Sequence, residues 1–316
     1  MDDKSSCGRL AIVGPGRAGT ALSLALVARG WTVSAVAGRA PDAASTRRVA
    51  AAFDARAVPV ADAGCDADLV IVATPDGGIA DAAASLAPSL SAGALVLHLS
   101  GARTLHEFDD LVLARPDVAV GSLHPLQSLP SGEVGSARLP GSWCAVDGPD
   151  AVERIALALG MRPFRVGAAD RVRYHATACI ASNHLVALLG QVERLAAGAG
   201  VPFEALLPLV RATVENVDDL GPAGALTGPV ERGDAATVAA HLDALPAEER
   251  AAYRALAEAA LRLAGRDDHE LVELFSEAPS PDPSRELRGS GERPGGRRPG
   301  IPAGERARPG AEDVLT

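Results

Sequence analysis

The stretch that decides the fold is RLAIVGPGRAGTALSLALVARG, residues 9–30. It begins with a short apolar run typical of a buried strand and continues with the apolar spacing of a helix. Between them lie Gly14, Gly16 and Gly19. At such a junction the first glycine makes a tight turn, the second lets the backbone approach a phosphate, and the third lets helix pack on strand. We therefore predict a strand–turn–helix unit whose helix N-terminus binds an anion.

Apolar runs of this kind continue through the first half of the chain and alternate with helical patterns. The further runs are TVSAVA (32–37), ARAVPV (55–60), DADLVIVATP (66–75), ALVLHLSG (94–101) and VAVGSLHP (118–125), with helical patterns at 42–53 and 79–90. Short runs rich in Val, Ile and Leu between amphipathic helices indicate parallel strands that are buried on both faces. The sequence predicts an α/β fold, a doubly wound parallel sheet, over residues 9–168.

The second half of the chain has a different pattern. Residues 170–199 contain no proline and predict one long helix, and further helices are expected at 202–220, 234–244 and 246–264. An all-helical domain, residues 169–276, should therefore follow the sheet domain. Residues 279–316 are rich in Pro, Gly, Arg and Glu and have almost no apolar periodicity, so we expect a disordered tail.

Composition limits the possible partners. The chain has 316 residues and a formal net charge of -10, and aromatic residues make up 3% of it. A binder of nucleic-acid phosphates needs surplus Lys and Arg, so we expect a small-molecule ligand and no nucleic acid. The four cysteines are scattered without metal-ligand spacing, so no metal site is predicted. No signal peptide or long apolar span is evident, and we expect a cytoplasmic protein with no membrane partner.

The glycine-rich turn predicts a dinucleotide site. Its expected cofactor-binding residues are Gly14, Pro15, Gly16, Arg17, Ala18 and Gly19. An NAD site usually has a carboxylate after the second strand, whereas Arg39 stands there and can pair with a 2′-phosphate, with Arg47 and Arg48 one helix away. We predict NADP(H), the alternative being that these arginines are only solvated. After the fourth strand Thr74 and Pro75 should line the nicotinamide side, unless Pro75 merely ends the strand.

Two strands end in side chains suited to proton transfer. Ser100 follows one strand and His124 ends the next, so both should lie at the carboxyl edge of the sheet near the cofactor. An imidazole with a pKa near 6.5 can accept or return a proton as a hydride moves, and a serine hydroxyl could orient it. The alternative is that His124 only caps a turn before Pro125.

The long helix carries a polar stripe. His175, Cys179 and Asn183 are spaced i, i+4, i+8, and Tyr174, Ser182 and His184 flank them. We predict that Asn183 fixes a substrate oxygen, that His175 donates a hydrogen bond or a proton, and that Tyr174 contacts the substrate. The alternative is a polar domain interface.

The segment ALTGPVERGD, residues 225–234, breaks the helical pattern further along the chain. Thr227 and Arg232 are predicted to bind an anionic substrate. Alternatively, the segment is a helix connection with Asp234 as N-cap.

Four motifs together resemble the bacterial Rossmann-like proteins that carry a DUF2520 C-terminal domain. These motifs are GPGRAG, SLHPLQS, YHATACIASNHLVALL and LTGPVERGD, and the resemblance covers about residues 9–276. The group is assigned to NADP-dependent oxidoreductases. More distantly the layout is similar to pyrroline-5-carboxylate reductase, ketopantoate reductase and prephenate dehydrogenase. Prephenate dehydrogenases have a serine after one strand and a catalytic histidine in an HP step after the next, which Ser100 and His124 match, although LQSLPSG then departs from that pattern. Ketopantoate reductases use a helix lysine with an asparagine, and because no lysine follows Lys4, His175 or another group would have to replace that lysine.

These observations predict an NADP-dependent oxidoreductase that moves a hydride to or from a small carboxylate-bearing substrate between the two domains. His124 would be the acid/base, Ser100 its partner, and His175 and Asn183 would position the substrate. The alternatives are a noncatalytic NADP-binding sensor and a ketopantoate- or imine-type reductase with another proton donor. Ala- and Leu-rich faces at 176–198 and 251–264 further predict a homodimer.

Overall fold

The computed structural model describes residues 8–276, so the predicted tail at 279–316 lies outside the described residues. The chain divides into two compact units between Val192 and Glu193. Each unit is described by itself below.

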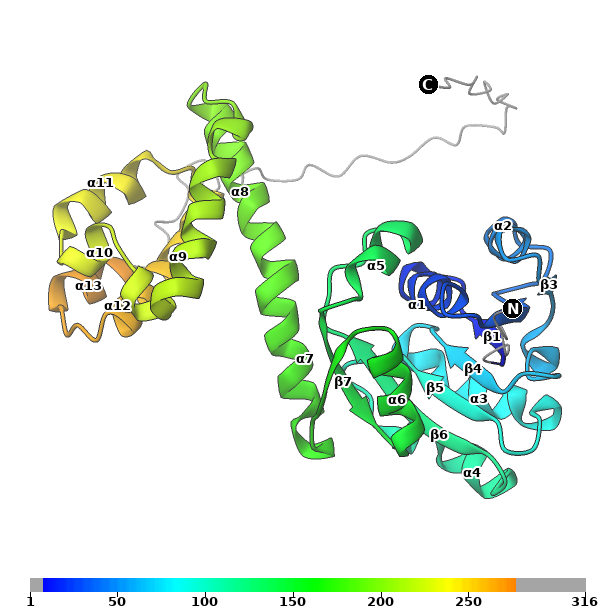
Figure 1. Cartoon of the computed structure of the whole chain (residues 1–316). Helices are drawn as coiled ribbons and strands as arrows, with labels where there is room; N and C mark the ends of the chain where they lie inside the picture. Colours follow the sequence, from blue (N-terminus) through cyan, green and yellow to red (C-terminus); the bar gives the residue numbers. More distant parts are fainter. Residues whose placement is uncertain (1–7, 277–316) are drawn as a thin grey trace, which may run out of the picture. The chain divides into compact units, whose positions relative to one another are not determined.

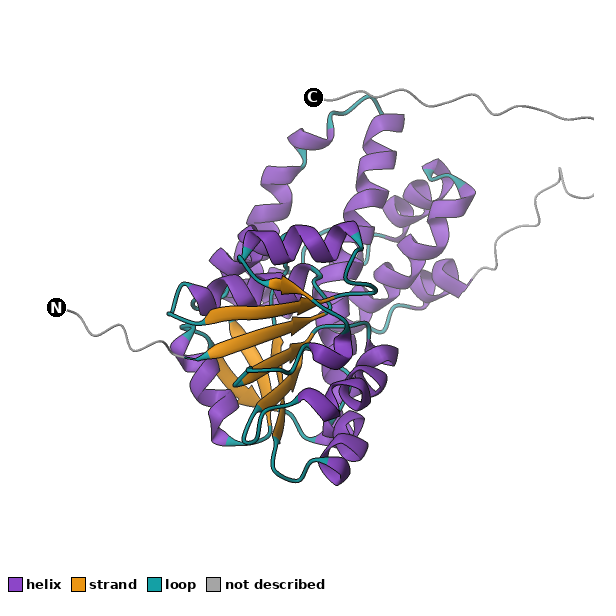
Figure 2. Cartoon of the chain, turned by 90° about the vertical axis from the view of Figure 1, so that its right-hand side faces the viewer, coloured by secondary structure: helices purple, strands orange, loops and turns teal. Residues whose placement is uncertain are grey.

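The first unit is built on one eight-stranded sheet with helices on both faces (Figures 1 and 2). Its strands are β1 (Arg9–Val13), β2 (Thr32–Ala37), β3 (Arg56–Ala57), β4 (Leu69–Val72), β5 (Leu95–His98), β6 (Ala119–Pro125), β7 (Trp143–Asp147) and β8 (Arg162–Arg165). Their order is β3-β2-β1-β4-β5-β6-β7-β8, and β1 to β6 are parallel. The predicted doubly wound α/β sheet is confirmed.

Alternating residues of the central strands enter two different cores. Leu10 and Ile12 of β1 belong to one apolar cluster, whereas Ala11 and Val13 belong to the cluster on the other face. The covering helices of this unit are α1 (Arg17–Val27), α2 (Ala44–Ala52), α3 (Ile79–Leu86), α4 (Asp109–Ala114), α5 (Gly132–Arg138), α6 (Asp150–Ala158) and α7 (Arg171–Cys179). Burial on both faces explains why these strands are mostly apolar, with Ser34 of β2 and His98 of β5 as buried polar exceptions.

One edge of the sheet differs from the prediction. Strand β7 runs antiparallel to β6, with His124 opposite Ala145, and β8 runs parallel to β7. Neither strand was predicted. β8 is hard to recognise in the sequence because it is only four residues long and includes Pro163. Such a short strand with proline is tolerated at a sheet edge.

The predicted helix at 170–199 consists of three segments in the structure. Helix α7 is followed by a π-helix, Ile180–His184, and then by α8 (Leu185–Gly198). The division between the two units falls inside α8, later in the chain than the predicted boundary at residue 168. The reason is that α7 is anchored to the sheet by hydrogen bonds from its first residue, Arg171.

The second unit is helical in the part that the structure describes. Its helices are α9 (Leu207–Ala225), α10 (Pro229–Arg232), α11 (Ala235–Ala244), α12 (Ala247–Leu263) and α13 (His269–Ser276), around a small core that includes Val238, Leu242 and Leu261. Among the described helices, none alone has the length and apolar composition to cross a membrane, while one bent pair, 168–198 with 203–232, passes that test by length and composition only.

Candidate functional site

The three glycines of the first turn have three different environments. Gly14 has a φ of 92°, and a Cβ there would lie 2.6 Å from the Ala73 carbonyl. A Cβ at Gly16 would meet nothing within 4 Å, so the backbone there is open to a ligand. A Cβ at Gly19 would lie 2.8 Å from the Ala73 Cβ, because α1 packs closely on β4. These are the environments that a dinucleotide turn requires.

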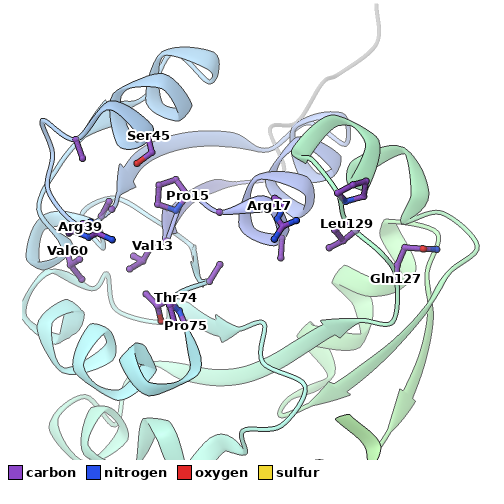
Figure 3. A pocket seen from close by; sticks show the side chains of 18 of the residues that line it. Val13, Pro15, Arg17, Arg39, Ser45, Val60, Thr74, Pro75, Gln127 and Leu129 are labelled. Atoms are coloured by element: carbon purple, nitrogen blue, oxygen red, sulfur yellow. The ribbon is translucent and has the colours of Figure 1, made fainter. Parts of the chain in front are cut away.

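The turn opens into a cavity of about 1120 Å³ at the carboxyl ends of β1 and β4. The strand order reverses between these two strands, which is where open α/β sheets bind ligands. Figure 3 shows Arg39 and Ser45 at one end of the cavity, Pro15 and Arg17 in the middle, and Gln127 and Leu129 at the other end. The cavity is therefore long enough to present different groups to the two ends of one ligand.

The middle of the cavity suits a pyrophosphate. Helix α1 begins after Gly16 with no side-chain cap and has no acidic residue in its first turn, so its N-terminus is available to an anion. The buried Oγ1 of Thr74, which also lines the cavity, has no hydrogen-bond partner within the described chain. A polar group buried without a partner is costly, and a bound ligand can satisfy it.

The end of the cavity beyond β2 is positively charged. Arg39 lines it, and Ser45, in the first turn of α2, lines it as well. No carboxylate is among the lining residues, and the charged ones are Arg17 and Arg39. Ser45 was missed from the sequence, although a serine at the start of the helix after β2 was a usable signal. Arg47 and Arg48 are exposed on α2 and do not line the cavity.

A second cavity, of about 700 Å³, adjoins the first. Gln127, Ser128, Ser182 and Asn183 line both cavities, so they form the boundary between them. The second cavity is otherwise lined by side chains from the end of β6, from β8 and from the long helix, none of them Asp, Glu, Lys or Arg: His124, Pro125, Leu126, Phe164, Tyr174, His175, Thr177, Ala178, Cys179, Ala181, Leu185 and Val186.

His124 is the central polar group of the second cavity. It lies within β6 and pairs with β7, so it is not a turn residue. Its Nδ1 shares a hydrogen bond of 2.7 Å with the Tyr174 hydroxyl, and its ring packs edge-on against that of His175 at 5.8 Å between centroids. Tyr174 was predicted to contact substrate, which stays a prediction, and the structure places its hydroxyl against His124.

Burial keeps the imidazole of His124 neutral. It lowers the pKa of His124 to about 4, with further lowering by the charges of His175 and Arg171 and opposition from Asp76. Burial also raises the pKa of the Tyr174 hydroxyl to about 12. The expectation of a pKa near 6.5 was therefore wrong, because it assumed a solvated ring.

Ser100 does not orient His124, which corrects the prediction. The Ser100 Oγ accepts hydrogen bonds from the backbone N–H groups of Ala102 (3.2 Å) and Arg103 (3.0 Å) in its own turn. Nδ1 of the imidazole is bonded to Tyr174 instead. Their places after two strands located Ser100 and His124 at the carboxyl edge of the sheet, as predicted, but could not show which groups the Ser100 hydroxyl contacts.

The residue after Ser100 has a clear role at the site. A Cβ at Gly101 would lie 2.7 Å from Cδ2 of His175 and 2.9 Å from Nε2 of His124. Glycine at this position therefore lets the two imidazoles approach the end of β5.

The structure brings part of the predicted stripe on the long helix together. A ring nitrogen of His175 lies 4.0 Å from the Cys179 Sγ, and Asn183 lies in the π-helix and lines both cavities. Thr227 and Arg232 belong to the second unit, and their predicted contact with substrate stays a prediction. Asp234 accepts a hydrogen bond from the Thr237 N–H and is the N-cap of α11, as the alternative interpretation of that segment expected.

Arg171 was missed entirely. It is fully buried at the start of α7. It donates hydrogen bonds to Ser100 after β5, to Arg103 in the loop that follows, and to Ser122 of β6. In the sequence it is one of two arginines in DRVR, and nothing distinguishes it from the exposed Arg173.

The fold and the glycine-rich crevice define a Rossmann-like α/β protein. Residues 2–121 match the family model of a Rossmann-like domain, and residues 144–260 match that of DUF2520, a domain of unknown function. The chain therefore combines a Rossmann-like domain with a DUF2520 domain, as its sequence motifs suggested. No curated protein matches it in sequence.

Three solved structures are similar over most of their length. A candidate NADP oxidoreductase from Bacteroides fragilis has a TM-score of 0.70 at 22% identity, covering 81% of this chain and 98% of that chain. A protein from Thermotoga maritima has a TM-score of 0.59 at 23% identity, with the same coverage of 81% and 98%. A reductive aminase from Aspergillus terreus in complex with NADPH has a TM-score of 0.51 at 17% identity, covering 85% and 91%. At these identities the likeness shows the fold.

Proposed function

We propose that this protein is an NADP-dependent oxidoreductase that transfers a hydride between the nicotinamide ring and a small substrate bound beside His124. The observation that carries this proposal is the continuity of the two cavities. Gln127, Ser128, Ser182 and Asn183 line both, so a dinucleotide held at the glycine turn would end where the second cavity begins. The names of two structural neighbours, an NADP oxidoreductase candidate and a reductive aminase that binds NADPH, support the same activity.

The cavity residues divide into three groups along the cofactor. The turn at 14–19 and the N-terminus of α1 would hold the pyrophosphate, because this helix end has no side-chain cap and no acidic residue in its first turn. Arg39 and Ser45 would hold the 2′-phosphate. Thr74 and Pro75, after β4, would lie on the nicotinamide side, where Thr74 has an unpaired hydroxyl.

His124 would supply or accept the proton that accompanies the hydride. When the Tyr174 hydroxyl donates to Nδ1, the ring proton is on Nε2 and would pass to the substrate oxygen or nitrogen as the hydride adds to carbon, while the tyrosine proton moves to Nδ1, so the ring stays neutral and the tyrosine becomes a phenolate. In the reverse reaction Nε2 would accept the proton from the substrate and Nδ1 would return its proton to the phenolate. The two tautomers of one neutral ring thus serve the two directions of reaction. When bound, the nicotinamide supplies or accepts the hydride.

The substrate would be small and held by Asn183 and His175. We propose that the substrate has a carboxylate group. This proposal rests on the prediction that Thr227 and Arg232 of the second unit bind an anion. The lining of the second cavity has no charged side chain, which suits an uncharged reacting end. Each 2-keto acid should therefore be assayed beside its methyl ester, since a higher kcat/KM for the acid supports a carboxylate site and a higher value for the ester contradicts it.

The decisive experiment measures binding first and turnover second. NADPH should bind with a fluorescence change, and a panel of 2-keto acids, their esters, cyclic imines and cyclohexadienyl acids should then be screened at the nicotinamide absorbance band. His124→Gln should keep NADPH binding and lose turnover. Tight NADPH binding without turnover on any compound would favour the noncatalytic sensor, and no NADPH binding would reject the proposal.

We further propose that the protein works in the cytoplasm as a homodimer formed through its long helices. Helix α9 has no buried residue, and its Leu209, Val214 and Leu220 are exposed. Apolar side chains in such number on one helix favour a second copy as partner. Light scattering at micromolar concentration should give twice the chain mass, and L209E/L220E should give the chain mass with NADPH binding intact. A wild-type mass of a single chain would reject the dimer.

A further inference from the structure

Arg171 is a buried cation without a carboxylate partner. Its side chain is the largest that is fully buried in the described chain. Nη2 donates to the Ser100 carbonyl oxygen (3.1 Å) and to the Ser122 Oγ (2.9 Å), and Nε donates to the Arg103 carbonyl oxygen (3.2 Å). All three acceptors are neutral, and Nη1 has no partner among the described residues. Burying a charge in this way is costly, so a structural or functional gain must offset it.

The three acceptors lie on segments that build the site. Ser100 follows β5, Arg103 lies in the loop before the 3₁₀ turn Leu105–Phe108, and Ser122 lies in β6 two residues before His124. Arg171 is the first residue of α7, and Tyr174 and His175 follow it at i+3 and i+4. Residues with this spacing share one face of a helix.

We propose that Arg171 is a positioning residue: its guanidinium clamps the first turn of α7 onto the ends of β5 and β6 and so holds Tyr174 and His175 against His124. The proposal rests on the function proposed above for His124, but its geometry stands on Arg171 alone. Without the clamp, α7 would lose its hydrogen bonds to the sheet, and the 2.7 Å contact between Tyr174 and His124 would no longer be fixed.

The charge of Arg171 adds a second effect. His124 is faced by His98 from β5, Asp76 from the turn after β4, and His175 and Arg171 from α7. Asp76 favours the protonated ring, while Arg171 and the two histidines disfavour it. Asp147 of β7 acts on Arg171 and on His98 but forms no recorded ion pair with the guanidinium. Arg171 therefore works with burial to keep the imidazole of His124 neutral.

The test uses three variants at the clamp and one matched control. Arg171→Lys keeps the positive charge but loses the planar guanidinium with its several N–H donors. Arg171→Gln loses the charge and keeps an amide donor, and Ser122→Ala removes only one hydrogen-bond acceptor. Arg173→Gln is the control, because Arg173 lies two residues along the same helix with an 85% exposed side chain paired to Asp170. Circular dichroism melts would confirm folding of each, and Ser122→Ala gives a reading even if the Arg171 variants unfold.

Two readouts separate the clamp from the proposed activity. The first is the NMR titration of the His124 ring, which needs no turnover: Arg171→Gln should raise its midpoint by about one pH unit, while Ser122→Ala and Arg173→Gln should leave it in place. The second is kinetic: Arg171→Lys and Ser122→Ala should lower kcat by about 10-fold or more with NADPH affinity unchanged, as expected for a misplaced acid/base.

The outcomes are distinct. Folded Arg171→Gln with an unchanged His124 titration and an unchanged kcat overturns the proposal. If wild-type protein shows no turnover at all, the proposed function fails. The NMR titration of the His124 ring and the NMR signal of the Tyr174 hydroxyl proton then still decide whether Arg171 positions Tyr174 and the histidine.

Discussion

The hydroxyl of Tyr174 lies 2.7 Å from Nδ1 of His124, although the two residues are fifty positions apart in the chain. This contact joins the start of α7 to the end of β6 and selects which nitrogen of the imidazole faces the second cavity. The first prediction concerns this pair.

Tyr174→Phe should lower kcat by about 10- to 100-fold, because no hydroxyl can then exchange a proton with Nδ1 of His124. NADPH affinity should not change, since Tyr174 does not line the first cavity. The chain offers a matched control: Tyr253 and Nδ1 of His241 form a similar hydrogen bond of 2.8 Å in the second unit. Steady-state kinetics of Tyr253→Phe should equal the wild type. Equal kcat values for Tyr174→Phe and wild type would show that the hydroxyl has no part in the reaction.

The two buried histidines should make stability depend on pH. Burial is the largest cause that lowers the pKa of His98 and of His124 to about 4. An unfolded histidine titrates near pH 6.5, so between about pH 6.5 and 4 the unfolded state binds more protons. The stabilisation that comes from keeping these rings neutral is therefore fully present above pH 6.5. The free energy of unfolding falls as the pH drops towards 4, by at most about 3 kcal/mol for each ring.

Urea unfolding at several pH values measures this dependence. His124→Gln should remove part of the slope between pH 7 and 4.5, whereas His184→Gln, at an exposed position of the π-helix, should not. A slope that is the same in His124→Gln and wild type would contradict the assignment.

The glycines of the first turn should separate stability from binding. Gly19→Ala places a methyl group 2.8 Å from the Ala73 Cβ, and such overpacking should cost about 1–3 kcal/mol of stability. Gly16→Ala meets no atom of the chain within 4 Å, so its melting temperature should stay near that of the wild type while NADPH affinity falls. Thermal melts and fluorescence titrations test both, and a Gly16→Ala variant that binds NADPH normally would place the pyrophosphate elsewhere.

Arg39 should decide between the two nicotinamide cofactors. Removing one charge-assisted contact to a phosphate costs about 1.5–3 kcal/mol, so Arg39→Ala should weaken NADPH binding about 10- to 100-fold and affect NADH little. Arg48→Ala, on the same helix as Ser45 but outside the cavity, is the control. Tighter binding of NADH than of NADPH by the wild-type protein would reject the preference.

The sheet could be predicted from the sequence because its chemistry is local. A strand buried on both faces must be largely apolar, and the buried positions of β1, β2, β4 and β5 show this, apart from Ser34 and His98. The same rule could not find β8, which lies at the edge, is exposed or half-buried and includes a proline, or β7 beside it, which has only three buried residues.

The site was predictable only as far as the edge on which it lies. The residues of the glycine turn, together with His124, His175 and Asn183, were located by their places at strand ends and on one helix face. The partners of these groups depend on tertiary packing: Tyr174 rather than Ser100 meets His124, and Arg171 rather than Arg173 enters the core. In a helix, side chains two positions apart point in nearly opposite directions, so only the docked helix shows which arginine is buried.

The position of His124 inside a strand has a consequence for any attempt to redesign this protein. His124 pairs with Ala145 of β7, and β5 pairs with β6 up to Ser122, so a shift of the His124 Cα would disturb the ladder with β7. The opposite wall of the second cavity is made of helix side chains such as Cys179, Val186 and Ala178, which can be exchanged without disturbing a strand. A laboratory library aimed at new substrates should therefore vary that wall and leave the strand as its fixed reference.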